Sequence, residues 1–149
     1  MNIRPLSADE VGLVAAWVAT IPLWQRYGTT AEGLSEKLRH ALVSDLILTA
    51  DTQDRAVGLA WCVPQGGFGR SAYLKLLGVR PDQAGAGVGA ALLTALEATV
   101  TSQDLILLTS DFNHDAQRFY RRQGYQQIGA IPGYVLPDVT ELIWRKRLR

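Results

Sequence analysis

Three glycines at alternate positions are the chain's most informative feature, in the run Gly85-Ala86-Gly87-Val88-Gly89. They follow a stretch of branched residues that ends at Val79, and they lead into a stretch with helical periodicity. Glycine lets the backbone approach a ligand closely, and the first N–H groups of a helix lack intrahelical acceptors and lie at its positive end. The pattern predicts a diphosphate site, although glycines in such a turn can also serve close packing alone.

The same run, extended to Ala90, also satisfies the dinucleotide fingerprint G-x-G-x-x-A. A Rossmann unit needs several further βαβ crossovers and an acidic residue at the end of the next strand, about 20 positions on. Only 60 residues follow Gly89, Asp104 precedes its strand, and Asp111 comes late. These mismatches disfavour a nicotinamide or flavin site.

Periodicity predicts the elements that must hold this loop. After a short N-terminal strand, one helix opens at the capping box Ser7-Ala8-Asp9-Glu10 and runs to Pro22, and a second opens at Thr29-Thr30-Ala31-Glu32. Three branched or aromatic stretches then predict an antiparallel meander. They are Leu46–Ala50, Ala56–Val63 and Ala72–Val79.

The region after the glycines has a different pattern. Val88, Leu92 and Leu96 predict a long helix, and the continuous apolar run Leu105–Leu108 predicts a buried strand parallel to the last strand of the meander. A short helix should end at Gly124. Strands near Tyr125–Ile131 and Val139–Lys146 complete a single domain over residues 1–149.

Bulk composition excludes several classes of function. A net charge of +1 offers no broad field for nucleic acid or an anionic membrane. Cys62 is the single cysteine and cannot form an internal disulfide, which favours a reducing compartment. No apolar run has the roughly 18 residues that a membrane span needs. We expect a soluble, cytoplasmic protein with no nucleic-acid or membrane partner.

A second motif runs from Asn113 to Tyr125 and follows the form N-x-x-A-x-x-F-Y-x-x-x-G-F, with Tyr125 in place of the last Phe. The glycine loop, from Ala84 to Gly89, follows the form Q/R-x-x-G-x-G/A. On these two motifs the chain resembles the GCN5-related N-acetyltransferase (GNAT) superfamily. Ala84 replaces the usual Gln or Arg, and Ala86 replaces a frequent basic residue.

The resemblance implies an α/β (α+β) fold, with a mixed, mostly antiparallel sheet of about seven strands, a central parallel pair that splays apart, and about four helices. It implies acetyl-CoA as cosubstrate and no metal, with pantetheine along the strand that ends at Val79. The cofactor-binding residues it implies are Leu77, Val79, Ala84, Gly85, Ala86, Gly87, Val88, Gly89 and Asn113.

The resemblance also implies Tyr120 as the acid that protonates the departing CoA thiolate. A strand irregularity near Leu77-Gly78 could supply an N–H to the thioester oxygen. An amine also needs a base, but the strand before the loop presents Lys75 where many relatives carry a carboxylate. Asp111, or a water chain through backbone carbonyls or Tyr73, are the alternatives, and Asp111 also suits a turn.

The function expected is transfer of an acetyl group from acetyl-CoA to a primary amine of a small molecule or protein. The alternative is an acyl-CoA-binding sensor of the same fold without turnover. The first two helices and the strand ends should wall the acceptor site, with aromatic surface from Trp24, Tyr27, Trp61 and Tyr73.

The remaining polar and apolar features carry weaker expectations. His40 and His114 are isolated and give no metal-ligand set. Arg118, Arg121 and Arg122 form a solvated helix face from which one or more could meet a CoA phosphate. The apolar strand with Leu142, Ile143 and Trp144 could pair across a homodimer.

Overall fold

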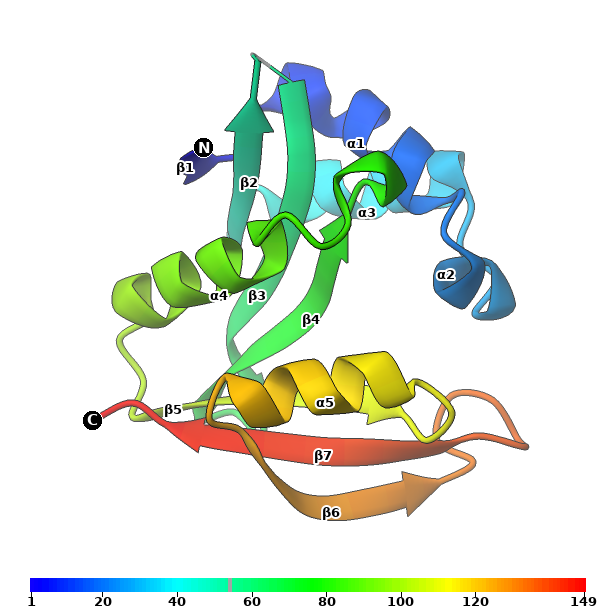
Figure 1. Cartoon of the computed structure of the whole chain (residues 1–149), viewed down its shortest axis with the longest axis vertical. Coiled ribbons are helices and arrows are strands. Elements are labelled where there is room, and N and C mark those ends of the chain that lie inside the picture. Colours follow the sequence, from blue (N-terminus) through cyan, green and yellow to red (C-terminus); the bar gives the residue numbers. More distant parts are fainter. Residues whose placement is uncertain (54) are drawn as a thin grey trace.

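The computed structural model describes residues 1–53 and 55–149, in which seven strands form one sheet (Figure 1). The strands are β1 (Asn2–Pro5), β2 (Leu46–Thr52), β3 (Arg55–Gly67), β4 (Ser71–Val79), β5 (Asp104–Ser110), β6 (Gln126–Pro132) and β7 (Thr140–Arg147). The helices are α1 (Val11–Val18), α2 (Pro22–Arg26), α3 (Ala31–Ala41), α4 (Val88–Thr99) and α5 (His114–Arg122), with 3-10 turns at Ala8–Glu10 and Pro81–Gln83.

The sheet has the order β1-β2-β3-β4-β5-β7-β6. Every neighbouring pair is antiparallel except β4 and β5, which are parallel and joined through α4. This arrangement confirms the predicted mixed, mostly antiparallel sheet with a central parallel pair.

The parallel pair is short and then opens. Only Ala72–Leu74 of β4 pair with Leu105–Leu107 of β5, although both strands continue beyond these residues. Figure 1 shows β4 diverging from the β5, β7 and β6 half of the sheet. One edge of β4 beyond Leu74 therefore has no strand partner in the described structure.

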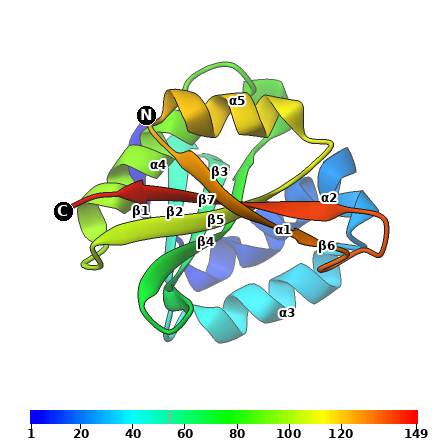
Figure 2. The ribbon, with the colours of Figure 1, turned by 90° about the horizontal axis from the view of Figure 1, so that it is seen from below.

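Helices cover both faces of the sheet. Figure 2 shows α4 and α5 on one face and α1 and α3 on the other. Leu92 and Leu96 of α4 are fully buried in the first core, and Val14 and Val18 of α1 are fully buried in the second. Burying each such side chain contributes about 1.5–3 kcal/mol. Two packed cores thus hold β4 and the rest of the sheet between different helices on its two faces.

Close packing positions α4. A Cβ added to Gly58 of β3 would come within 2.7 Å of the side chains of Val88 and Leu92. Only glycine leaves room for the first two turns of α4 at that distance from the sheet. The start of α4, directly after the glycine loop, is therefore held against the centre of the sheet.

The N-terminal helices begin where capping predicts. The Ser7–Glu10 capping box is present, and Thr30 Oγ1 accepts a hydrogen bond from the Gly33 N–H at 3.1 Å. The first helix, however, ends at Val18, and Pro22 opens the additional helix α2 instead of ending the first one. Proline suits the first position of a helix because its missing N–H is not needed there.

The C-terminal strand does not lie where a dimer contact would need it. β7 is hydrogen-bonded to β5 on one side and to β6 on the other, so the strand with Leu142, Ile143 and Trp144 has no free main-chain edge with which to pair across a homodimer, and the homodimer itself stays a prediction. The strands at the sheet edges are β1 and β6. Separately, none of the described helices has the length and apolar character needed to cross a bilayer.

Candidate functional site

The glycine loop turns sharply between β4 and α4. Gly85 and Gly87 have φ values of 79° and 83°, and a Cβ added at either one would meet nothing within 4 Å. Glycine is favoured at both positions because the backbone is left-handed there. Crowding is not the reason, because an added Cβ would lie in open space. Gly87 is the N-cap of α4, so the turn aims the start of the helix at open space.

Five main-chain N–H groups of this segment have no acceptor among the described residues. They belong to Gly85, Gly87, Val88, Gly89 and Ala90. The Ala84 and Ala86 N–H groups instead donate to carbonyls within the loop, at 3.3 and 3.4 Å. Of the residues expected to bind a diphosphate, those two therefore have their amides already engaged.

A cavity of about 580 Å³ lies beside these donors, and we call it the loop cavity. Arg122 of α5 also lines it and has no ion pair within the described structure, whereas Arg118 pairs with Asp115 and Arg121 lies over the Trp144 ring. The lining includes seven of the nine expected cofactor-binding residues. These are Leu77, Val79, Ala84, Gly85, Gly87, Val88 and Gly89.

The other two expected residues lie outside the loop cavity. Ala86 is exposed at the tip of the turn. Asn113 is the N-cap of α5, where its Oδ1 accepts a hydrogen bond from the Ala116 N–H at 3.2 Å. Its side-chain NH₂ remains, and Asn113 lines a different cavity.

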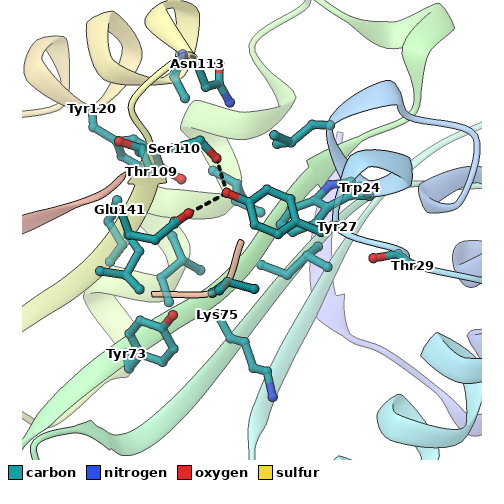
Figure 3. A pocket seen from close by; sticks show the side chains of 18 of the residues that line it. Trp24, Tyr27, Thr29, Tyr73, Lys75, Thr109, Ser110, Asn113, Tyr120 and Glu141 are labelled. Carbon is teal, nitrogen blue, oxygen red and sulfur yellow. Dashed lines mark hydrogen bonds between the residues drawn. The ribbon is translucent and has the colours of Figure 1, made fainter. Parts of the chain in front are cut away.

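That second cavity has a volume of about 360 Å³ and opens where β4 and β5 diverge (Figure 3). We call it the aromatic cavity, because Trp24, Tyr27, Tyr73 and Tyr120 line it. Trp61, expected in the same wall, lies in an adjoining smaller cavity. The aromatic cavity and the loop cavity have Leu77, Ala116 and Tyr120 in common.

Tyr120 therefore lies where the two cavities meet. Its side chain is 8% exposed and packs edge-to-face against Phe119 and Tyr125, with ring centroids 5.1 and 5.6 Å away. Burial raises the pKa of the phenol above its usual value, so the group stays protonated at neutral pH. Its hydroxyl makes no hydrogen bond to any residue the structure describes, which leaves it free to donate.

A buried carboxylate in the aromatic cavity was not foreseen from the sequence. Glu141 of β7 is 5% exposed and accepts a hydrogen bond from the Tyr27 hydroxyl, which also bonds to Ser110 of β5 (Figure 3). Burial, followed by the contact with Glu141, raises the pKa of Tyr27 to about 12. Tyr27 is therefore a neutral donor that orients the carboxylate.

Only a weak signal in the sequence marks Glu141. It is the single acidic residue in the apolar run of β7, next to Leu142 and Ile143. Asp111, the carboxylate considered for a base, caps the end of the β5–β7 ladder by accepting from the Thr140 N–H at 3.2 Å. Asp111 is exposed and lines neither cavity, so it acts as a turn residue.

The irregularity in β4 lies upstream of the expected position. The β3–β4 register shifts between the pairs Trp61–Leu76 and Cys62–Leu74, so the extra residue is Lys75. The irregularity expected near Leu77-Gly78 thus lies at Lys75, and its expected place at Gly78 is wrong, because Leu77 and Gly78 both pair regularly with β3. A Cβ at Gly78 would be 3.5 Å from the Trp17 ring, so Gly78 provides a surface for that ring.

The bulge directs a cation toward the smaller cavity. Lys75 Nζ lies 4.5 Å from the centre of the Trp61 ring, a cation–π contact.

The described residues contain no group of three or more histidine, cysteine or acidic side chains able to hold a metal ion.

Comparisons with known proteins agree with this geometry. Residues 14–125 match the family described as Acetyltransferase (GNAT) family. No curated protein matches the chain.

Solved structures share the fold at low sequence identity. An acetyltransferase of the GNAT family from Bacillus cereus superposes with a TM-score of 0.81 at 15% identity, over 98% of this chain and 96% of that one. An aminoglycoside 6'-N-acetyltransferase complexed with coenzyme A gives 0.79 at 18% identity, over 100% and 98%. A ribosomal-protein-alanine N-acetyltransferase from Brucella melitensis gives 0.81 at 19% identity, over 99% of both chains.

The family match spans most of the chain and includes both the glycine loop and the helix that carries Tyr120. The shared fold extends from end to end of the chain. The chain therefore belongs to the acetyltransferase (GNAT) family.

Proposed function

We propose that this protein transfers the acetyl group of acetyl-CoA to a primary amine by direct attack, with both substrates bound at once. The observation that supports this most strongly is the junction of the loop cavity and the aromatic cavity at Leu77, Ala116 and Tyr120. A thioester entering from one side and an amine entering from the other would meet there. Such alignment replaces much of the entropic cost of a bimolecular reaction.

The loop cavity suits the CoA end of the donor. The free N–H groups from Gly85 to Ala90 can donate to the diphosphate at the positive end of α4, and Arg122 can add a charge-assisted contact. The partnerless edge of β4 up to Val79 offers main-chain groups to the pantetheine amides. Leu77 and Val79 are the residues of β4 that line this path.

Glu141 is the base in this proposal. An alkyl amine with a pKa near 10 is about one part in a thousand neutral at pH 7, so its proton must be removed before attack. Glu141 lines the aromatic cavity, and the Tyr27 hydroxyl holds it in place. Many relatives carry a carboxylate on the strand that corresponds to β4, where this chain has Lys75 instead. Glu141 would take over the role of that carboxylate.

Tyr120 is the acid. When the amine nitrogen bonds to the acetyl carbon, the carbon–sulfur bond breaks and the sulfur leaves as a thiolate. Glu141 takes the first proton from the ammonium group before attack and passes it to water, and it then takes the second proton from the nitrogen once that nitrogen has bonded to the acetyl carbon. Tyr120 donates its proton to the departing sulfur. This transfer is uphill, because a thiol pKa of about 8.5 lies below the value of about 10 for a phenol and burial raises the pKa of Tyr120 further. Reprotonation of the tyrosinate from bulk water draws the transfer forward.

Direct attack is favoured over an acetyl-cysteine intermediate. Cys62 is the only cysteine, is fully buried, and lines neither cavity. Burial raises the pKa of its thiol to about 12, so almost no nucleophilic thiolate exists at neutral pH. A ternary complex is therefore the simpler route.

Two measurements test this function together. Calorimetric titration with acetyl-CoA, free CoA and NAD should show binding of the first two only. Release of free thiol from acetyl-CoA should then depend on an added amine, with intersecting initial-rate lines. Binding without amine-dependent release across a broad panel would reject acetyl transfer to amines and fit the sensor instead.

A further inference from the structure

The aromatic cavity continues into a smaller cavity of about 200 Å³, which we call the lysine cavity. Lys37 of α3 and Lys75 of β4 line both, as do Tyr27 and Thr29. The shared lining shows that the two spaces form one continuous recess. A molecule bound in the aromatic cavity can therefore extend into the lysine cavity.

Both lysines are available to a ligand. Each is exposed, and neither forms an ion pair with a described carboxylate. Lys75 Nζ is held over the Trp61 ring, whose indole N–H donates to Asp45 at 2.9 Å. Asp45 lines neither cavity, so the cation faces the recess without a carboxylate in the lining beside it.

The opposite charge lies at the other end of the recess. Glu141 is the one carboxylate among the described residues that line the two cavities, and it lines the aromatic cavity, as Tyr120 does, but not the lysine cavity. Figure 3 shows the Lys75 ammonium pointing away from the Glu141 carboxylate. The recess is therefore negative at its reacting end and positive at its far end.

We propose that the acceptor is an amine that also carries an anionic group, with the amine at Glu141 and the anion at Lys37 and Lys75. This inference rests on the proposed function, because it takes the aromatic cavity as the acceptor site. A polycationic acceptor would meet two like charges in the lysine cavity and a single carboxylate to offset them. The charge pattern favours an acidic amine over an aminoglycoside.

The spacing of the strands limits how close the two groups can be. β5 separates β4, which carries Lys75, from β7, which carries Glu141. Two strand spacings place the main chains of β4 and β7 roughly 10 Å apart, the divergence of β4 from β5 adds to this, and the Lys75 side chain points away from Glu141 (Figure 3). The carboxylate of a free α-amino acid is too near its amine to bridge that distance. Acceptors with several bonds between amine and anion fit, such as an ω-amino acid or a short acidic peptide.

Matched pairs of acceptors test the charge preference. The ω-amino acids 4-aminobutanoate, 6-aminohexanoate and 8-aminooctanoate are compared with their primary amides, and glycyl-glycyl-aspartamide with glycyl-glycyl-asparaginamide. Each pair differs in one negative charge. Exposed ion pairs of this kind change kcat/KM by roughly two- to fivefold per lysine. For the longer pairs we expect kcat/KM for the acid to exceed kcat/KM for the amide by about the square of that factor. Added salt should reduce this ratio.

Substitution of the lysines assigns the preference to this recess. In the double variant Lys37→Gln with Lys75→Gln, the acid-to-amide ratio should fall to near one, whatever happens to the rate itself. Arg70→Gln is the matched control, because Arg70 is an exposed cation at the β3–β4 turn and lines neither cavity. That control should keep the ratio of the unsubstituted protein.

Three outcomes separate this inference from the proposed function. A ratio above one that disappears only in the lysine variant supports the inference. Amine-dependent thiol release with equal use of acids and amides, or with preference for a polycationic aminoglycoside, overturns the inference and leaves the N-acetyltransferase proposal standing. No release with any amine, despite acetyl-CoA binding, overturns both.

Discussion

The loop cavity and the aromatic cavity meet at Tyr120 but are built from different materials. The loop cavity presents main-chain N–H groups from one continuous segment, Gly85–Ala90, beside apolar side chains and the charged side chains of Asp115 and Arg122. The aromatic cavity presents ionisable and aromatic side chains that come from α2 and its end, α3, β4, α5 and β7, together with hydroxyl groups from β5. The loop cavity is suited to a ligand that stays the same from one reaction to the next. The aromatic cavity is suited to selecting one particular ligand through its side chains.

This difference has a consequence for substitutions. Main-chain donors persist when a side chain changes, so replacements in the loop cavity should matter mainly where the backbone conformation requires glycine. In the aromatic cavity each polar group is itself a side chain. Single replacements of the groups that handle protons there should therefore reduce turnover while leaving acetyl-CoA binding intact.

The largest effect is expected for Glu141→Gln. Gln keeps the shape and can still accept from the Tyr27 hydroxyl, but it cannot take a proton from the amine. Loss of a general base lowers kcat by roughly 10²–10⁴-fold. Steady-state kinetics should show this loss, and calorimetry should show an unchanged Kd for acetyl-CoA.

Asp111→Asn provides the matched control for that variant. Asp111 lies at the end of the same β5–β7 pair but outside both cavities. We expect its kcat to stay within about twofold of the parent, since an exposed substitution of this kind has little effect. Equal losses in the two variants would contradict the assignment of the base.

Tyr120→Phe should have the next largest effect, about 10²-fold on kcat, because it removes the proton donor for the leaving sulfur. Stability should change little, since the hydroxyl has no partner within the described residues. Tyr125→Phe is the control, because the Tyr125 hydroxyl donates to Glu97 at 2.8 Å, away from the junction. That variant should have a lower melting temperature and an unchanged kcat.

The features that were predicted correctly are local in sequence. The turn from strand to helix at the glycine loop, the caps at Ser7 and Thr30, and the succession of strands along the chain each follow from short runs of adjacent residues. The role of Tyr120 as the acid was inferred from the family motif that runs from Asn113 to Tyr125, and it stays a prediction. Local spacing specifies a helix start or a turn because it determines backbone geometry directly.

The features that were missed depend on distant pairs. Tyr27 bonds to Ser110 and Glu141, which lie 83 and 114 positions further along the chain. The residues next to Glu141 in the sequence do not indicate that a tyrosine lies beside it. The bulge at Lys75 likewise arises from the register against β3, which composition does not specify. Side-chain sites assembled across a sheet require the pairing of strands, whereas a main-chain site on one loop does not.

Gly87→Ala tests the loop cavity. The left-handed φ of 83° costs an alanine about 1–2 kcal/mol, which the chain can relieve only by turning the start of α4. We expect lower stability together with an acetyl-CoA Kd raised about tenfold. Gly69→Ala is the control: Gly69 has a φ of 72° and equally open surroundings at the β3–β4 turn. It should lose similar stability with no change in Kd.

The smallest effect is expected for Tyr27→Phe, which leaves Glu141 without its donor and should lower kcat/KM for the amine by about fivefold, in line with roughly 1 kcal/mol for a hydrogen bond. Tyr73→Phe is the control, since the Tyr73 hydroxyl bonds to no described residue, and a comparable loss there would favour a water relay instead.

Because the pKa of Tyr27 is raised from 10 to about 12, the contribution of Tyr27 to stability is complete below about pH 10 and is lost as the pH rises toward 12. The difference in melting temperature between the parent and Tyr27→Phe should therefore be constant at neutral pH and narrow above pH 10, and a difference that widens there would mean that Tyr27 does not donate to Glu141.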